Sequence, residues 1–216
     1  MNTAKKVAVI GLGNIGKVVA KNLVKGNRPI IVATRNLEDA QAYANELGRL
    51  ATATETAEAI RQADIVVLSV WFNTIGEFMT KYANELKGKI IIDPSNPIAP
   101  DENGGFKKII GEKESAGLIN ASLLPNGATM AKALGTLGAA SLESAAFQSP
   151  EKATLFYATD DRAIDADVEQ LINDNGFAPV RVGGIDQSIR IEVFGDLHEF
   201  GALGRTVTVA EAKSNI

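Results

Sequence analysis

Short apolar runs alternate with amphipathic segments along most of this chain, beginning with Val7–Ile10. Runs that are rich in β-branched residues and bounded by turn residues predict buried strands. The run over 64–70 is almost continuously apolar, which is typical of a central parallel strand covered on both faces. Strands are therefore predicted over residues 7–10, 29–33, 49–53, 64–70, 89–93, 129–134, 154–158 and 179–182.

Helical periodicity occupies the segments between these strands. Helices are predicted from about residue 14, with Gly26 at the C-terminal cap, and over 37–47, 54–62, 75–86, 115–124 and 162–175. Strands that alternate with helices predict an open α/β sheet. From Ile185 onward the pattern is mixed, and we expect a mostly helical tail that packs on the core or on a second subunit. The polar stretch 101–114 is expected to form an excursion or a flap.

Composition narrows the class of protein. The 216 residues are 45% hydrophobic and 22% charged, which suits one globular core. The net charge of −4 argues against nucleic acid as a partner. There is no apolar run of about 18 residues, so no membrane span is expected. The segment Met1–Lys6 leads directly into the first strand, which leaves no room for a signal peptide. The absence of cysteine fits a reducing compartment, so a cytoplasmic location is expected.

The supply of reactive side chains is small. The chain has no cysteine and one histidine, His198. These counts exclude disulfides, thiolate nucleophiles and multi-histidine metal sites, and no metal site is expected. The chemistry is therefore expected to come from a bound cofactor or from Asp, Glu, Lys, Ser and Tyr side chains. His198 itself is expected to be a partly exposed, hydrogen-bonded helix residue.

A glycine motif follows the first strand. The residues are Gly11, Leu12, Gly13, Asn14, Ile15 and Gly16, which read G-x-G-x-x-G. The first glycine permits a sharp turn, the second lets the backbone approach a pyrophosphate, and the third lets the helix pack close to the strand. The alternative is a tight turn that binds nothing. Because a strand precedes the motif and a helix follows it, we predict a dinucleotide site.

The end of the second strand indicates which dinucleotide binds. NAD enzymes normally place Asp or Glu there to bind the ribose 2′-hydroxyl. This chain has Thr34, Arg35 and Asn36 instead. A guanidinium can hold a 2′-phosphate, with Thr34 and Asn36 donating beside it, so NADP(H) is the predicted cofactor. The alternative is a surface arginine without a ligand.

Further candidates follow the other strands, because ligands of an open α/β sheet lie beyond the carboxyl ends of its strands. The predicted contacts for the nicotinamide half are Val70, Trp71, Phe72, Asn96 and Pro97. For Trp71 and Phe72, core packing or an interface is an equally natural role. The predicted substrate contacts are Leu134, Gly135, Thr136 and Leu137, where small residues would leave space for a flat ring. The alternative is a loop that needs glycine for its backbone angles.

The order of motifs resembles the deazaflavin-dependent NADP oxidoreductase family, which includes the reductase domains of the STEAP metalloreductases. The resemblance covers nearly the whole chain. It is carried by the glycine motif, Thr34–Asn36, Pro94–Pro97, Lys132–Leu137 and Phe177–Gly183. It implies a Rossmann-type doubly wound, mostly parallel sheet over residues 1–184 and a short C-terminal helical extension over 185–216, often in a homodimer.

The resemblance also implies a reaction, namely hydride transfer between NADPH and a deazaflavin or flavin ring. The residues that match its NADP site are the glycine loop and Thr34–Asn36. Gly135 departs from the family, since the deazaflavin enzymes carry histidine there, and this leaves an ordinary flavin or another small-molecule ring acceptor open.

Three classes of function remain at this stage. The first is an NADPH-dependent oxidoreductase with no assigned catalytic side chain, since transfer between stacked rings needs orientation more than acid or base. Ser95, Thr136 and His198 are its candidate proton donors. The second is a small imine or ketone reductase resembling pyrroline-5-carboxylate reductase, which would need a donor near the nicotinamide and a longer helical dimer domain. The third is a non-catalytic NADP-binding sensor.

Overall fold

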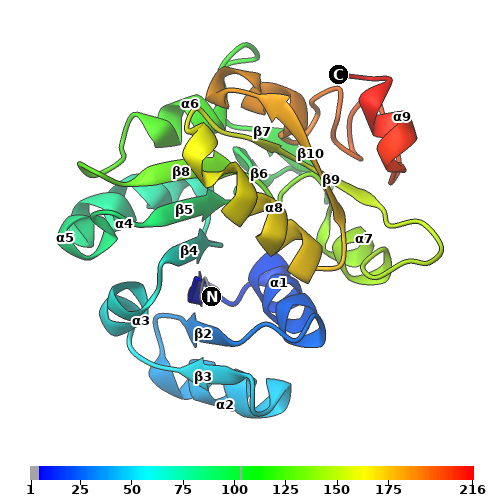
Figure 1. Ribbon diagram of the computed structural model, residues 1–216. Helices are drawn as coiled ribbons and strands as arrows, with labels where there is room; N and C mark the ends of the chain where they lie inside the picture. The colour runs from blue at the N-terminus through cyan, green and yellow to red at the C-terminus, as the bar shows by residue number, and fades with distance from the viewer. Residues whose placement is uncertain (1–4, 103) are drawn as a thin grey trace.

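The computed structural model describes residues 5–102 and 104–216 (Figure 1). Residues 1–4, part of the segment for which no signal peptide is expected, lie outside this description. The described chain forms an eight-stranded sheet in the order β10-β9-β8-β5-β4-β1-β2-β3. Its strands are β1 (Val7–Ile10), β2 (Ile30–Ala33), β3 (Ala51–Ala53), β4 (Ile65–Leu68), β5 (Ile90–Asp93), β8 (Thr129–Lys132), β9 (Thr154–Ala158) and β10 (Ala178–Gly183).

The sheet is mostly parallel, which confirms the predicted Rossmann-type fold. Across the sheet, the six adjacent strands β3, β2, β1, β4, β5 and β8 all run parallel to one another. Strand β9 is antiparallel to β8, joined at the single pair Lys132 and Ala158, and β10 is parallel to β9. The strand order reverses between β1 and β4, which are adjacent, hydrogen-bonded strands. The ligand crevice of a doubly wound sheet opens at such a reversal.

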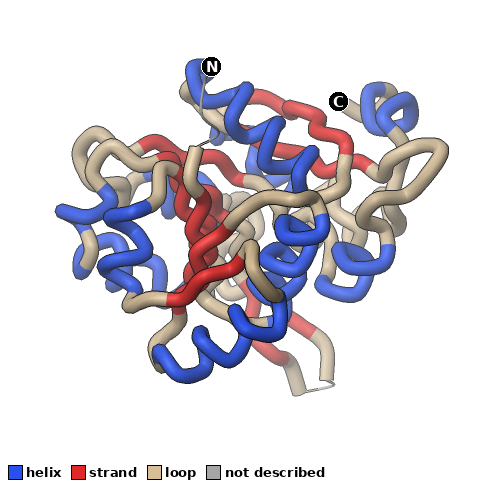
Figure 2. The backbone as a smooth tube through the Cα atoms, turned by 60° about the horizontal axis from the view of Figure 1, so that its bottom comes forward, coloured by secondary structure: helices blue, strands red, loops and turns tan. Residues whose placement is uncertain are grey.

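Helices cover both faces of the sheet (Figure 2). Val7 and Val9 of β1 belong to one apolar cluster, whereas Ala8 and Ile10 belong to another, as the alternation along a strand requires. The first cluster contains residues of α1 (Asn14–Lys25), α2 (Leu37–Leu47), α7 (Ala139–Ser144) and α8 (Asp165–Asp174). The second contains residues of α3 (Thr56–Gln62), α4 (Ile75–Lys81) and α5 (Ala83–Leu86), with α6 (Ala116–Ala121) packed against it.

Several predicted boundaries are wrong for local reasons. The helix expected over 75–86 divides into α4 and α5, because Tyr82 leaves the helical region at φ −110° and ψ 24°. The helix expected over 162–175 begins as a 3₁₀ turn, η2 (Arg162–Ile164), which the Asp161 side chain caps. The stretch 101–114 contributes to a projecting hairpin, β6 (Ile98–Pro100) paired with β7 (Phe106–Lys108), at the lower edge of Figure 2.

The tail is less helical than expected. It consists of the 3₁₀ segment η3 (Ile185–Ile191), a series of turns, and α9 (Val209–Lys213). Two glycines explain the turns, because a Cβ at Gly195 would overlap the carbonyl of Arg190 and a Cβ at Gly201 would overlap that of Gly195. The tail packs on the outer strands through a cluster that contains Phe156, Ala158, Val180, Ile191, Leu197, Val207 and Ala212.

His198 lies in one of these turns, not in a helix, and its side chain is 1% exposed, so the expected partial exposure is wrong. Its expected hydrogen bonding is confirmed. The amide of Phe200 donates to Nδ1 at 3.0 Å, so Nε2 carries the proton and donates to the Gly135 carbonyl at 3.0 Å. Burial, assisted by the positive charge of Lys132, lowers the pKa of His198 to about 4, against the opposing effects of the Gly135 carbonyl and Glu199.

This buried imidazole predicts a loss of stability in acid. The folded-state pKa, about 4, lies below the ordinary value of 6.5, so between these values the unfolded chain binds more protons. The stability contributed by neutral His198 is complete above pH 6.5 and falls as the pH drops toward 4. We expect a loss of about 2 kcal/mol between about pH 7 and pH 5 from this group. Urea unfolding of the wild type and of His198→Gln measures it, and equal pH dependence in the two proteins would contradict the assignment.

Candidate functional site

The glycine loop lies at the point where the strand order reverses. The amide of Gly11 donates to the Ala33 carbonyl at the end of β2, and the amide of Ser69 after β4 donates to the Ile10 carbonyl, both at 2.8 Å. Gly11 has φ +91°, and a Cβ there would overlap the carbonyl of Ser69. A Cβ at Gly16 would overlap the carbonyl of Gly11. The fold itself therefore requires these two glycines.

Gly13 differs from the other two glycines of the motif. It has φ −76°, which any residue can adopt, and it is exposed. Apart from Gly13 itself and its two chain neighbours, no heavy atom lies within 4 Å of the place that a Cβ would take. The packing of the protein thus gives no reason for glycine at this position, and the open space in front of it is available to a ligand.

The start of α1 offers free hydrogen-bond donors beside that space. Gly13 is its N-cap, no side chain caps the helix, and its first turn contains no acidic residue. The first N–H groups of a helix and its dipole attract an anion, and here no side chain occupies the place of that anion. Asn14 is exposed in the first turn, whereas Leu12 and Ile15 are half-buried and pack against the core.

The segment after β2 supplies a cation. Arg35 is exposed, and it forms no ion pair within the described part of the chain. The side-chain oxygen of Asn36 accepts from the Glu38 amide at 2.9 Å and caps α2, which leaves its amide N–H groups to donate. Thr34 is half-buried beside them.

Trp71 and Phe72 follow β4, next to the glycine loop. Trp71 is 60% exposed and Phe72 is half-buried at the start of the 3₁₀ helix η1 (Phe72–Thr74). Thr74 holds this turn, since its amide and hydroxyl both donate to the Trp71 carbonyl. Core packing therefore does not account for Trp71, whereas Val70 packs against the second apolar cluster.

Asn96 and Pro97 lie in the loop after β5. The Asn96 amide donates to the Gly135 carbonyl at 3.0 Å, and its oxygen accepts from the Val193 amide at 2.7 Å. The side chain thereby joins the loop after β5, the loop after β8 and the tail. Pro97 is buried.

The predicted substrate residues Leu134, Gly135, Thr136 and Leu137 are all buried. The open space expected at Gly135 is absent from this part of the structure, because a Cβ there would overlap the carbonyl of Pro94. Glycine is present for this close approach. Leu134 has φ +64°, a backbone conformation that a leucine rarely adopts and that persists only where its surroundings hold it.

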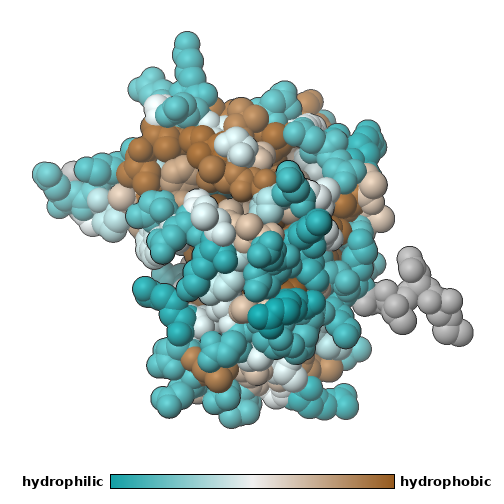
Figure 3. Space-filling model, turned by 90° about the vertical axis from the view of Figure 1, so that its left-hand side faces the viewer, coloured by the Kyte–Doolittle hydropathy of each residue, from teal (hydrophilic) through white to brown (hydrophobic). Residues whose placement is uncertain are grey.

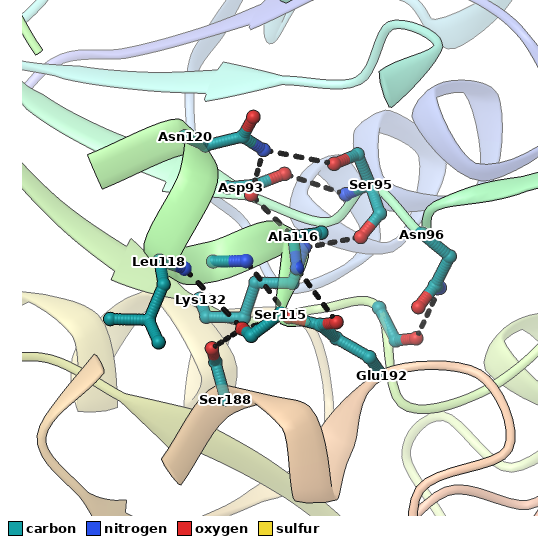
Figure 4. A network of polar contacts seen from close by, with 12 residues as sticks. Asp93, Ser95, Asn96, Ser115, Ala116, Leu118, Asn120, Lys132, Ser188 and Glu192 are labelled. Atoms are coloured by element: carbon teal, nitrogen blue, oxygen red, sulfur yellow. Dashed lines mark hydrogen bonds and ion pairs between the residues drawn. The ribbon is translucent and has the colours of Figure 1, made fainter. Parts of the chain in front are cut away.

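Beneath these loops lies a network of buried polar residues that the sequence analysis missed (Figure 4). The Lys132 ammonium lies 3.0 Å from Asp93 Oδ2 and also donates to the Ser95 carbonyl. Asp93 further accepts from the Asn120 amide and the Ser95 N–H, both at 2.8 Å. Asp93 is the last residue of β5 and Lys132 is the last residue of β8, and the two strands pair with these residues opposite each other. The charged residue at the end of each apolar strand was therefore a signal that the sequence contained.

Glu192 is a second buried carboxylate that the sequence analysis missed, and it is 1% exposed. It accepts hydrogen bonds from the amides of Ala116 and Gly117 at 2.9 and 2.8 Å and from the Ser115 hydroxyl at 2.8 Å (Figure 4). The tail thus supplies the anion for the N-terminus of α6. No local pattern could have shown this contact, because the partners lie more than seventy residues apart in the chain.

The described residues contain no group of three or more His, Asp or Glu side chains that could hold a metal ion. Over residues 5–102 and 104–216, no helix has both the length and the apolar character that a membrane crossing requires.

Known proteins resemble this chain in sequence and in fold. Residues 6–97 match the model of the family described as NADP oxidoreductase, coenzyme F420-dependent. The chain is 24% identical over 189 residues to the metalloreductase STEAP3 of Rattus norvegicus, covering 88% of this chain and 36% of that protein. It thus spans about a third of that relative's length.

Two solved structures share the fold. One is the hypothetical protein SMa0349 from Sinorhizobium meliloti, with a TM-score of 0.81, 26% identity and coverage of 94% of this chain and 95% of that one. The other is a putative F420-dependent NADP-reductase from Arthrobacter sp. FB24, with a TM-score of 0.72, 21% identity and coverage of 85% and 86%. The predicted resemblance is confirmed over residues 6–97, which match that family model.

Proposed function

We propose that this protein is an NADPH-dependent oxidoreductase that transfers a hydride between NADP(H) and a flavin or deazaflavin ring. The observation that carries the proposal is the open place of a Cβ at Gly13, which is the N-cap of the otherwise uncapped helix α1. A pyrophosphate is the group that needs both features, a backbone without a Cβ and several free N–H donors.

The 2′-phosphate of the cofactor would bind at Arg35. The guanidinium is exposed and free of ion pairs within the described residues, so binding breaks no existing interaction. Its planar donors fit a phosphate, and Thr34 and the amide of Asn36 can donate beside it. The same position would offer NAD no acidic partner for its ribose.

The nicotinamide half would then lie toward β4, β5 and β8, between Val70, Trp71 and Phe72 on one side and Asn96 and Pro97 on the other. Trp71 has an exposed ring that could stack on the cofactor or on the acceptor. The segment Leu134–Leu137 would form the floor of the acceptor site by its backbone, since its side chains are buried.

The alternatives make different demands on the site. An imine or ketone reductase needs a proton donor near the nicotinamide, but His198 and Ser95 are buried and Thr136 is 2% exposed. Both ring nitrogens of His198 are already hydrogen-bonded. This favours transfer to a ring, for which orientation suffices. A non-catalytic NADP sensor would share every binding feature and differ only in the absence of turnover.

We further propose that the protein acts in the cytoplasm as a homodimer.

The first test follows NADPH oxidation by absorbance with FMN, FAD, riboflavin and the deazaflavin coenzyme offered separately. We expect turnover with a ring acceptor and a lower rate with NADH as donor. NADPH binding without turnover of any ring would reject the proposed reaction, and turnover of a cyclic imine alone would favour the second class.

Gly13→Val tests the pyrophosphate contact. The valine side chain would occupy the open space and exclude the phosphates, while the fold has room for it. We expect NADPH binding to be lost in calorimetry with an unchanged melting temperature, and Gly13→Ala to give an intermediate affinity. Unchanged affinity in the valine variant would mean that the loop is only a turn.

Arg35→Ala tests the choice of cofactor. Loss of the charge-assisted bonds should weaken NADPH binding by roughly tenfold to a hundredfold and leave NADH binding nearly unchanged. Arg49→Ala is a matched control, because Arg49 is also exposed but precedes β3. It therefore lies at the amino end of the parallel strands, whereas Arg35 lies at their carboxyl end. Equal weakening of both cofactors by Arg35→Ala would refute the 2′-phosphate contact.

A further inference from the structure

The polar side chains buried in the tail are hydrogen-bonded to the segments around α6 and to the loop after β8. From the start of η3 to Phe200 the buried polar residues are Ser188, Glu192 and His198. The Ser188 hydroxyl lies 2.6 Å from that of Ser115, which precedes α6. Glu192 binds the start of α6, and His198 binds the loop after β8. Burying polar groups in this way is costly unless each is paired, so the geometry of the tail is fixed by these loops.

The carbonyl of Gly135 is the point where three segments meet. It accepts one hydrogen bond from Asn96 in the loop after β5 and another from His198 in the tail, both at 3.0 Å. On its other side Gly135 lies against the backbone of Pro94. A shift of this one carbonyl would therefore disturb both loops that border the proposed nicotinamide site.

The loop that carries this carbonyl is strained, since Leu134 has φ +64° immediately before Gly135. The tail adds two further bonds to the loop. The Glu199 amide donates to the Thr136 carbonyl at 3.2 Å, and the Gly138 amide donates to the Glu199 carboxylate. These contacts hold a backbone that would relax without them.

We propose that His198 is a positioning residue, which through the carbonyl of Gly135 holds the loops after β5 and β8 in the arrangement required for hydride transfer. This role rests on the proposed function. His198 does not touch the reacting atoms, because it is buried behind the loop. Misplacing a reactive pair by a fraction of an ångström to one ångström reduces the rate of transfer strongly, whereas the cofactor phosphates bind at the other end of the sheet edge.

Two substitutions at this position separate hydrogen bonding from size. His198→Gln keeps one N–H donor and one acceptor, whereas His198→Leu keeps the bulk and removes both. We expect His198→Leu to lower kcat by roughly tenfold to a hundredfold with an unchanged Kd for NADPH. His198→Gln should recover most of the lost kcat. Asp196→Asn is the control, because it weakens the exposed pair with Arg190 in the same tail and touches neither loop.

The measurements are kcat and KM with the ring acceptor that the wild type reduces, the Kd of NADPH by calorimetry, and the melting temperature. A folded His198→Leu variant with the wild-type kcat would overturn the proposal. So would equal losses of kcat in His198→Leu and His198→Gln. If His198→Leu does not fold, His198→Asn takes its place: its shorter side chain is expected to lose the bond to the Gly135 carbonyl and to lower kcat in the same selective way, and an unchanged kcat would again overturn the proposal. Absence of any turnover by the wild type would instead reject the proposed function on which this role rests.

Discussion

The close approach of β1, the following loop and α1 at Gly11 and Gly16 is the contact on which the site depends. Two backbone carbonyls, those of Ser69 and Gly11, occupy places where any side chain would have to lie. Because of this contact, α1 begins directly at the reversal of strand order, where the ligand crevice of a doubly wound sheet opens. Gly13 then leaves the place of a Cβ open at that point. One short segment thus contains two glycines that the fold needs and one that a ligand would need.

The two halves of the sheet edge are built differently. The half that would hold the phosphates consists of exposed groups with free donors, namely Arg35, Asn36 and the start of α1. The half that would hold the rings consists of loops locked by buried hydrogen bonds and by the pair between Asp93 and Lys132. Binding can use flexible, solvated charges, whereas hydride transfer requires fixed geometry. The distribution of buried polar groups follows this difference.

The sequence predicts the parts that are determined locally. Apolar runs located the strands of the sheet, and the glycine motif located the turn from β1 into α1 at the reversal of strand order. The position of Arg35 followed from its place after the second strand. These signals succeed because strand burial and turn geometry depend on a few adjacent residues.

What the sequence did not predict depends on contacts between distant segments. Glu192 binds α6, and His198 binds the loop after β8, across more than sixty residues of chain. The mixed polar pattern of the tail looked helical, yet Gly195 and Gly201 are needed for backbone crossings that no periodicity records. The glycine at position 135 suggested open space beside the loop. In the structure the carbonyl of Pro94 occupies the place that a side chain of residue 135 would take.

The most direct test of the proposed site is the affinity of the wild-type protein for NADP⁺ and for NAD⁺, measured side by side by calorimetry. We expect NADP⁺ to bind roughly tenfold to a hundredfold more tightly, because only its 2′-phosphate can engage Arg35. Equal affinities would contradict the assignment of the cofactor, and no binding of either would contradict the assignment of the crevice as a dinucleotide site.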